Sequence, residues 1–482
     1  MGTMMWYVAA ALLAVVANPC VAAYYPATLG AEVTTVPGLT EPYPYKHYSG
    51  YLTAGEGRQL HYWFFESQQS PSSDPVLLWM NGGPGCSSLV ATVGELGPFR
   101  VGDLGLNMTL NPDTWVKVAN VLFLEAPAGV GYSYDPTGVY VTDDTQTADD
   151  NYLAVQDFFE KYPEYKKNDF YIAGESYAGV YVPTLASRVL KNPNGMQFKG
   201  IAIGNGAVDF PILGNSLIFF GNYHGLFGQR LWTALTQHCC NGSQLAQDCN
   251  FGWDITDDKC NEAVDEANNI ILHGGLNVYN LYDPCSYGDE PEPVAFASPK
   301  KRSMSQHKAQ RLIMKSLNRI SSLNRADSPE PMNIDNPNCV SEERLDLYFN
   351  RNDVKEALHV QETPAKWEPC STKLNYTEQY LSVRDVVREL VDSGRLRTLF
   401  YNGDVDMACN FIGGEWFVQS LGYRSKSEYK TWKAGLVIGG FFETFEKNIT
   451  FVTVKGAGHM VPLDKAPESL RMITNFLTNT PF

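Results

Sequence analysis

Residues 171–183 read Tyr-Ile-Ala-Gly-Glu-Ser-Tyr-Ala-Gly-Val-Tyr-Val-Pro, and this stretch decides the fold. Its order predicts a strand, a sharp turn that carries Ser176, and then a helix. Such a nucleophile elbow lifts the serine hydroxyl clear of the sheet and brings the Tyr177 amide towards a developing oxyanion. The expected pattern is Gly-x-Ser-x-Gly, and Ala178 occupies its fifth position. Glycine-flanked serines also form ordinary turns, so partners for Ser176 are needed.

Short β-rich runs alternate with helical patterns on both sides of the elbow. Strands are expected at 60–66, 75–80, 119–125, 169–173, 200–204, 397–401 and 450–455, with helices at 144–159 and 466–477. Alternating strands and helices predict an α/β fold with a mostly parallel central sheet flanked by helices. Residues 209–344 break this alternation with helical pieces, polar connections and six of the ten cysteines. We expect a mainly helical insertion (cap) domain there, between two core parts at 24–208 and 345–482.

Composition excludes some classes of partner. The chain has 482 residues, 44% of them hydrophobic, and a formal net charge of −16. Nucleic-acid binding needs clustered Lys and Arg, so this acidic balance argues against it. After the amino-terminal region, we expect no segment that is both uncharged and continuously apolar over the ~20 residues of a membrane-spanning helix. We therefore expect no nucleic acid and no membrane association once the signal described below is removed.

The amino terminus and the cysteines indicate the secretory pathway. Met5 to Ala17 is apolar and is followed by the small residues of 20–23, which predicts a signal peptide at 1–23; a retained anchor is the alternative. Loss of Cys20 leaves nine cysteines, so at least one thiol stays unpaired within the monomer. Four tripeptides fit the glycan-acceptor pattern, at Asn107, Asn241, Asn375 and Asn448. These features predict a lysosomal or secreted protein.

A basic stretch begins at Lys300-Lys301-Arg302 and lies between two Pro-rich runs, at 291–299 and 329–337. It is either a solvated surface helix, a disordered loop, or a site of endoproteolytic processing. The candidate processed segment is 286–337.

A nucleophilic serine needs a general base and a carboxylate that orients the base. Among eight histidines, His459 alone follows a predicted strand on a tight glycine loop, Gly-Ala-Gly-His-Met-Val-Pro at 456–462. The loop after 397–401 carries two candidate acids, Asp404 and Asp406, and spacing does not choose between them. The chain order serine, aspartate, histidine is that of the α/β-hydrolases.

A second oxyanion donor is expected from the glycine-rich loop Trp-Met-Asn-Gly-Gly-Pro-Gly-Cys-Ser-Ser at 79–88, which follows an early strand. The alternative is a tight turn before a helix. Ser87 and Ser88 are rival nucleophiles, but we expect them to cap that helix.

These four motifs together resemble the serine carboxypeptidases, and the cathepsin A branch of that family fits best. The similarity runs from about Tyr48 to Phe482, and only 286–337 looks unlike the branch. The resemblance implies that Asp406 is the catalytic acid, with Ser176 and His459. It also implies oxyanion donors at the amides of Gly83 and Tyr177, a binding site for the substrate carboxylate, and a leaving-group (S1′) pocket with a hydrophobic preference. The carboxylate site would comprise Asn81, Gly82, Glu95 and Glu175, and the S1′ pocket Cys409 and Met460.

The carboxylate site has a testable consequence. Two glutamates that meet an anionic substrate in a partly dry pocket cannot all remain ionised, so at least one should hold a proton. Loss of that proton towards neutral pH weakens peptide binding, which predicts an acid optimum.

Family similarity further implies four disulfides: Cys86–Cys370, Cys239–Cys260, Cys240–Cys249 and Cys285–Cys339, with Cys409 left free. We expect a serine carboxypeptidase that acts on peptides with a free C-terminal carboxylate, with no cofactor and no metal, since a ligand motif such as His-Glu-x-x-His is absent. The alternatives are an acyltransferase or esterase on the same triad, or a scaffold that protects lysosomal glycosidases in addition to peptidase activity. A homodimer is a further candidate assembly.

Overall fold

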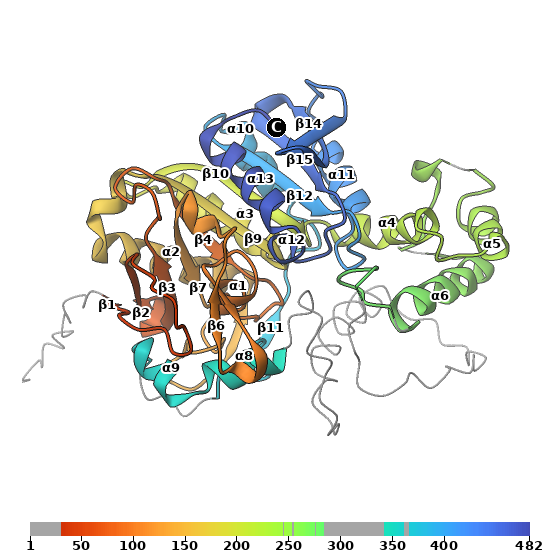
Figure 1. Ribbon diagram of the computed structural model, residues 1–482. Helices are drawn as coiled ribbons and strands as arrows, with labels where there is room; N and C mark the ends of the chain where they lie inside the picture. Colours follow the sequence, from red (N-terminus) through yellow and green to blue (C-terminus); the bar gives the residue numbers. More distant parts are fainter. Residues whose placement is uncertain (1–29, 244, 253–254, 275, 284–341, 361–365) are drawn as a thin grey trace, which may run out of the picture.

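The computed structural model describes residues 30–243, 245–252, 255–274, 276–283, 342–360 and 366–482 (Figure 1). The predicted signal peptide, the basic segment 286–337 and the pair Cys285–Cys339 lie outside these residues.

An eleven-stranded sheet forms the centre of the described chain, in the order β1-β2-β3-β7-β4-β9-β10-β12-β15-β14-β13. Neighbouring strands from β7 to β15 in this order are parallel, and the pairs at both edges are antiparallel. The prediction of a parallel sheet therefore holds for its middle, while the whole sheet is mixed. The strands span Ala31–Glu32 (β1), His47–Thr53 (β2), Gln59–Phe65 (β3), Val76–Met80 (β4), Asn120–Leu124 (β7), Asp169–Ser176 (β9), Gln197–Gly206 (β10), Arg397–Gly403 (β12), Lys430–Ala434 (β13), Val437–Phe445 (β14) and Ile449–Val454 (β15).

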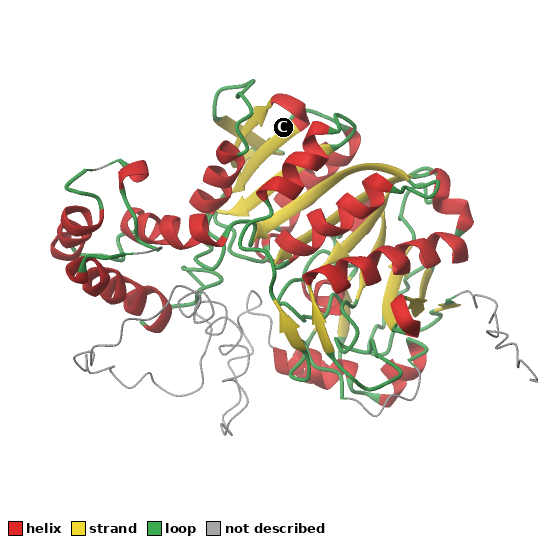
Figure 2. Ribbon diagram, turned by 180° about the vertical axis from the view of Figure 1, so that it is seen from behind, coloured by secondary structure: helices red, strands yellow, loops and turns green. Residues whose placement is uncertain are grey.

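Helices cover both faces of the sheet, and Figure 2 shows one layer in front of the strands. Strand β4 explains why two layers are needed: Leu78 packs into one apolar cluster and Trp79 into the other, and both side chains are fully buried. A strand buried on both faces reads as a continuous apolar run, as β4 does. One layer contains α2 (Asp144–Lys161), α3 (Ala178–Lys191), α10 (Arg384–Asp392) and α11 (Phe411–Ser420); the other contains α1 (Leu89–Gly94), α8 (Glu342–Phe349), α12 (Val461–Asp464) and α13 (Ala466–Thr478).

Smaller elements complete the described chain. Two additional two-stranded sheets pair β5 (Phe99–Val101) with β6 (Met108–Leu110) and β8 (Val141–Asp143) with β11 (Asn375–Thr377). Helix α9 spans Asn352–Ala357, and 3₁₀ turns lie at Gly55–Gly57, Asp103–Gly105, Trp115–Lys117, Pro163–Lys167, Ala246–Asp248 and Glu446–Asn448.

Three helices follow β10 in the predicted insertion: α4 (Phe210–Tyr223), α5 (Gln229–Cys239) and α6 (Asp258–His273). In Figure 1, α5 and α6 project from the side of the molecule, whereas α4 leads back to the sheet. Helix α4 packs closely on α11, since a methyl group added at Gly413 would come within 2.8 Å of the Leu213 side chain. The insertion is thus attached to the core through α4.

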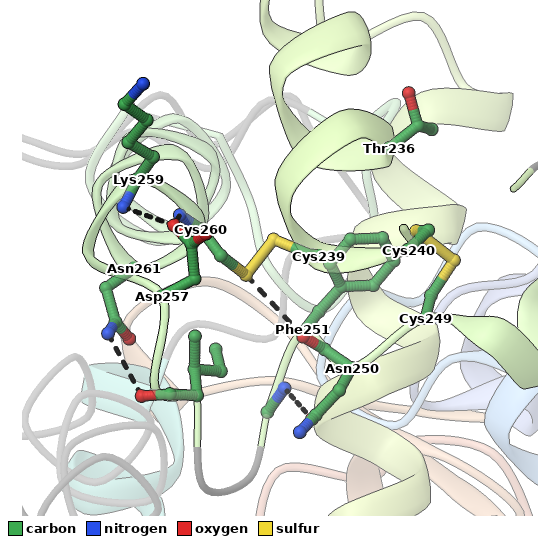
Figure 3. Close-up of a disulfide and its surroundings, with 12 residues drawn as sticks. Thr236, Cys239, Cys240, Cys249, Asn250, Phe251, Asp257, Lys259, Cys260 and Asn261 are labelled. Atoms are coloured by element: carbon green, nitrogen blue, oxygen red, sulfur yellow. Dashed lines mark hydrogen bonds between the residues drawn. A yellow bond between two sulfur atoms is a disulfide. The ribbon is translucent and has the colours of Figure 1, made fainter. Parts of the chain in front are cut away.

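Disulfides stabilise the outer helices (Figure 3). Cys239–Cys260 joins the end of α5 to the start of α6, and Cys240–Cys249 closes the loop after α5. A third bridge, Cys86–Cys370, links the glycine-rich loop to a segment 284 residues later. All three match predicted pairs. Cys409 is a free, buried thiol, also as predicted.

All four predicted glycan acceptors, Asn107, Asn241, Asn375 and Asn448, are solvent-exposed. Among the described helices, none is long and apolar enough to cross a bilayer.

Candidate active site

Ser176 is the last residue of β9 and has a backbone φ of 60°. A non-glycine residue in this left-handed region is strained, and such strain is typical of a nucleophile elbow. A methyl group at Gly174 would lie 2.6 Å from the Cβ of Ala178 and 2.5 Å from the Met80 carbonyl. Because residue 174 is a glycine, there is space for the Ala178 methyl group. The turn can therefore form with alanine in place of the second glycine of the Gly-x-Ser-x-Gly pattern.

The glycine-rich loop lies directly against the elbow. A methyl group at Gly82 would come within 2.3 Å of the Tyr177 nitrogen and 2.7 Å of the Ser176 Cβ. Gly83 has a φ of 114°, which only glycine adopts without strain. The loop thus brings its backbone beside the Ser176 turn, where the predicted oxyanion donors Gly83 and Tyr177 are needed.

Ser87 and Ser88 are not exposed nucleophiles, and they do not form a conventional helix cap. Ser88 stands at the N-cap of α1 but makes no capping bond; its hydroxyl donates to the Leu124 carbonyl at 2.7 Å. The Ser87 hydroxyl donates to Glu125 and accepts from the Leu89 amide. The expectation that both serines cap the helix was wrong for Ser88, because its hydroxyl bonds instead to the last residue of β7. This bond, and that of Ser87 to Glu125 just after β7, hold the loop on the sheet.

His459 pairs with Asp406 and not with Asp404. Its Nδ1 lies 2.8 Å from Asp406 Oδ2, and both side chains are buried. Asp404 instead accepts a hydrogen bond from the Gly456 amide at 2.6 Å. The tertiary structure thus separates two aspartates that spacing left equivalent, and the one beside His459 is Asp406, which the family resemblance implied.

Three further groups donate hydrogen bonds to the Asp406 carboxylate. Its oxygens accept from the amides of Ala408 and Cys409, at 2.9 and 3.1 Å, and from Asn205 Nδ2 at 2.8 Å. Burial alone lowers the pKa of His459, but the charge and hydrogen bond of Asp406, together with the charges of Glu95 and Asp464, raise that pKa above its ordinary value. The pair therefore stabilises an imidazolium, as a general base requires.

Ser176 lies at the same end of the parallel strands as Asp406 and His459. The carboxyl ends of β9, β10, β12 and β15 meet at one edge of the sheet, because these strands are parallel neighbours. Ser176 ends β9, and Asp406 and His459 follow β12 and β15. The Ser176 side chain is partly exposed and is not hydrogen-bonded to the His459 ring.

Three side chains of the predicted carboxylate site form one buried cluster. Asn81 Nδ2 donates to Glu95 Oε1 at 3.0 Å and to Glu175 Oε1 at 2.9 Å. Its Oδ1 accepts from Trp79 Nε1, which fixes the orientation of the amide. Both glutamates are at most 3% exposed, and Glu95 Oε2 has no hydrogen-bond partner in the part of the chain described.

The two glutamates favour the protonated state. Burial raises the pKa of Glu95, and burial followed by the charge of Glu95 raises the pKa of Glu175 well above its ordinary value. Burial also lowers the pKa of nearby Arg100 to about 10. The cluster therefore holds a carboxyl proton at pH values at which a surface glutamate is ionised.

The two residues predicted for the S1′ pocket lie beside Asp406 and His459. Cys409 is buried and donates its amide to Asp406, and Met460 follows His459 and is partly exposed. Burial, then the charges of Asp406 and Glu175, raise the pKa of the Cys409 thiol, so it behaves as an apolar neutral group. Within the described residues, no three His, Cys, Asp or Glu side chains are grouped as a metal site.

Sequence reasoning missed two residues that support the site. Asn205, fully buried at the end of β10, links Asp406 to the Gly403 amide. Asp144 accepts from the Tyr177 hydroxyl at 2.8 Å and from the Tyr376 hydroxyl at 2.7 Å. A signal for Asn205 existed, since a polar residue between glycines directly follows the apolar run 200–204; Asp144 offered none beyond a helix start.

Comparison with known proteins gives concordant results. A profile of the family described as serine carboxypeptidase matches residues 37–479. The lysosomal protective protein of Mus musculus is 40% identical, covering 94% of both chains, and the serine carboxypeptidase ctsa-4.1 of Caenorhabditis elegans is 39% identical, covering 96% of this chain and 95% of the relative.

Among solved structures, the Kex1(delta)p prohormone-processing carboxypeptidase of Saccharomyces cerevisiae superposes with a TM-score of 0.67 at 22% identity, covering 93% of this chain and 95% of that one. This similarity confirms the α/β-hydrolase fold. The match along nearly the whole length, the two relatives and the fold agree: the chain belongs to the serine carboxypeptidase family and is a serine-type carboxypeptidase.

Proposed function

We propose that this enzyme releases single residues from peptide C-termini through an acyl-enzyme formed on Ser176. The Ser176 oxygen attacks the last peptide carbonyl, and His459 takes the hydroxyl proton and returns it to the leaving amine. Water then attacks the ester, with His459 again as base, and releases the shortened peptide. Asp406 orients the imidazole, while the amides of Gly83 and Tyr177 stabilise the oxyanion.

The cluster of Asn81, Glu95 and Glu175 is the observation that carries the specificity for a free C-terminus. Glu175 is adjacent to Ser176, and Gly82 packs on the same turn. A substrate carboxylate would accept hydrogen bonds from the Asn81 amide, the Gly82 backbone and a protonated glutamate. An enzyme whose substrates lack a carboxylate would not need these two buried carboxyl groups for substrate binding.

An acid optimum follows from the same cluster. As pH rises through the raised pKa values of the two glutamates, the shared proton is lost. A carboxylate substrate then faces like charge and loses a hydrogen-bond donor. Binding should therefore weaken towards neutral pH. The buried thiol of Cys409 and the thioether of Met460 favour a hydrophobic leaving residue.

The surface of the protein and one of its relatives bear on its cellular setting. Four exposed glycan-acceptor asparagines support passage through the secretory pathway to the lysosome or the exterior. One similar protein is named lysosomal protective protein, which supports a lysosomal setting. A partnership with lysosomal glycosidases and a homodimer are further candidate roles that rest on the family resemblance alone. Helices α4–α6 support a division into a core of two parts and a cap at 209–344. The candidate processed segment 286–337 is proposed from its basic sequence alone.

The decisive experiment compares hydrolysis of an N-blocked dipeptide that has a free C-terminus with hydrolysis of its C-terminal amide, as a function of pH. We expect the wild type to prefer the free acid in acidic buffer, Ser176→Ala to lose activity, and Glu175→Gln to change the pH profile. The exposed Glu164→Gln is the matched control, since it removes a charge outside the cluster. Equal rates on acid and amide would favour an esterase or acyltransferase, and activity that persists in Ser176→Ala would exclude the mechanism.

A further inference from the structure

The eight residues 276–283 form a strap across both loops that carry the catalytic pair. The Val278 carbonyl accepts from the amides of Met407 and Ala408, at 3.0 and 3.1 Å. On the other loop, the His459 amide donates to the Tyr279 carbonyl at 2.7 Å, and the two rings are 5.0 Å apart. The strap therefore fixes Asp406 and His459 relative to each other by backbone bonds.

Asp464, at the end of α12, extends this arrangement with a side chain. Its Oδ2 accepts from the Gly458 amide at 2.6 Å and from Asn280 Nδ2 at 3.0 Å. A methyl group at Gly458 would lie 2.2 Å from the Tyr279 carbonyl and 2.9 Å from Asp464 Oδ2, so glycine is required there. The residue before His459 is thus clamped between the strap and Asp464.

We propose that Asp464, held by Asn280, is a positioning residue for His459. Asp464 also supplies a negative charge near the imidazole, and this charge is lost when Asp464 is protonated. This inference rests on the proposed hydrolytic role of His459. Asp464 does not touch the reacting atoms; it acts through the Gly458 backbone and through its charge.

The charges around Asp464 support this role. The pKa of Asp464 is raised to about 6, because burial raises it more than the hydrogen bonds from Gly458 and Asn280 lower it. The charges of Asp283 and Lys465 have smaller effects, which raise and lower this pKa respectively. The Asp464 charge in turn raises the pKa values of His459 and Glu175, although it is the smaller contributor to each. Glu95, itself buried, also raises the pKa of His459.

The sign of the effect favours catalysis in acid. As pH falls through about 6, Asp464 gains a proton and its charge no longer favours the imidazolium. The pKa of His459 then falls, so a larger fraction of the histidine stays neutral and able to act as base. Protonation of Glu95 acts in the same direction.

Asp464→Asn tests the charge, because the amide oxygen keeps an acceptor for Gly458. We expect the alkaline limb of the kcat/KM pH profile to move to lower pH, because Glu175 loses a nearby negative charge. Below about pH 6 the profile should stay close to that of the wild type, in which Asp464 is already protonated. Asp404→Asn is the matched control: it removes a carboxylate that holds Gly456 in the same loop through an equal 2.6 Å bond. An unchanged alkaline limb in Asp464→Asn, or equal shifts in both variants, would overturn the proposal.

Asn280→Ala tests the clamp and keeps the Asp464 carboxyl group. We expect kcat to fall on the order of tenfold with KM retained, because the His459 loop loses a tether; an unchanged kcat would contradict the positioning role. Active-site titration of Ser176 normalises all rates to correctly folded enzyme. The preference of the wild type for the free acid over the amide tests the proposed function separately. Loss of that preference would contradict the proposed function, whereas an unchanged pH profile in Asp464→Asn would contradict only the role of Asp464.

Discussion

Asn205 connects Asp406 to the neighbouring strand by two hydrogen bonds. Its Nδ2 donates to Asp406 Oδ2 at 2.8 Å, and its Oδ1 accepts from the Gly403 amide at 3.1 Å. The two asparagine atoms thus fix the carboxylate to the end of β12 from β10, across 201 residues of sequence. Asp406 then faces His459 with its orientation already set.

Removal of this side chain should slow catalysis. Asn205 has a φ of 39°, so Asn205→Gly deletes the side chain without backbone strain, whereas Asn205→Ala adds strain. We expect kcat to fall on the order of tenfold in Asn205→Gly with KM retained, because a tilted Asp406 orients His459 less well. Stopped-flow or steady-state kinetics measure this, and equal KM and kcat in wild type and Asn205→Gly would refute it.

The two aspartates of the 404–406 loop should differ sharply in their effect on rate. Asp406→Asn removes the charge that stabilises the imidazolium and favours the wrong tautomer, so we expect kcat to fall by about 10⁴. Asp404→Asn leaves the His459 contact intact and should keep most of the activity. Steady-state rates on a free-acid peptide distinguish them; comparable losses would mean that Asp404 shares the catalytic role.

The buried glutamates should make folding stability depend on pH. Their pKa values in the folded state are raised above the ordinary 4.5, so the folded chain binds more protons than the unfolded chain. Their stabilising contribution is fully present below pH 4.5 and is lost as pH rises through the folded-state pKa values. We expect Tm to fall less steeply over this range in Glu175→Gln than in wild type, as differential scanning calorimetry would measure. Identical slopes for the two proteins would contradict the assignment of a buried proton to this cluster.

Loss of either of two disulfides should destabilise the protein, but only loss of Cys86–Cys370 should also slow catalysis markedly. Loss of Cys86–Cys370 by Cys370→Ser should cost about 2–5 kcal/mol and also lower kcat, because the bridge anchors the loop that carries Gly83. Loss of Cys239–Cys260 by Cys260→Ser, in the outer helices, should destabilise the protein without a comparable loss of kcat. Denaturant unfolding and kinetics of both variants check this; equal losses of kcat would contradict the separation.

The amino-acid sequence alone predicted the elements whose form depends on neighbouring residues. The elbow at Ser176, the glycine loops at 82–85 and 456–458, and the buried strands follow from local apolar periodicity and from glycine's freedom near the backbone. Similarity of the four motifs to a known family then indicated the partners of Ser176 and three disulfide pairs that the structure contains.

The tertiary structure decided which distant side chains meet. Asp404 and Asp406 are two residues apart on one turn, and only the path of the loop after β12 brings Asp406 to His459, 53 residues further on. The bonds that Asn205, Asp144 and Asn280 make to the site could not be predicted from the sequence for the same reason. Their bonds depend on strand order and on how the insertion returns to the core, and a hydrogen bond between residues far apart in sequence leaves no local pattern.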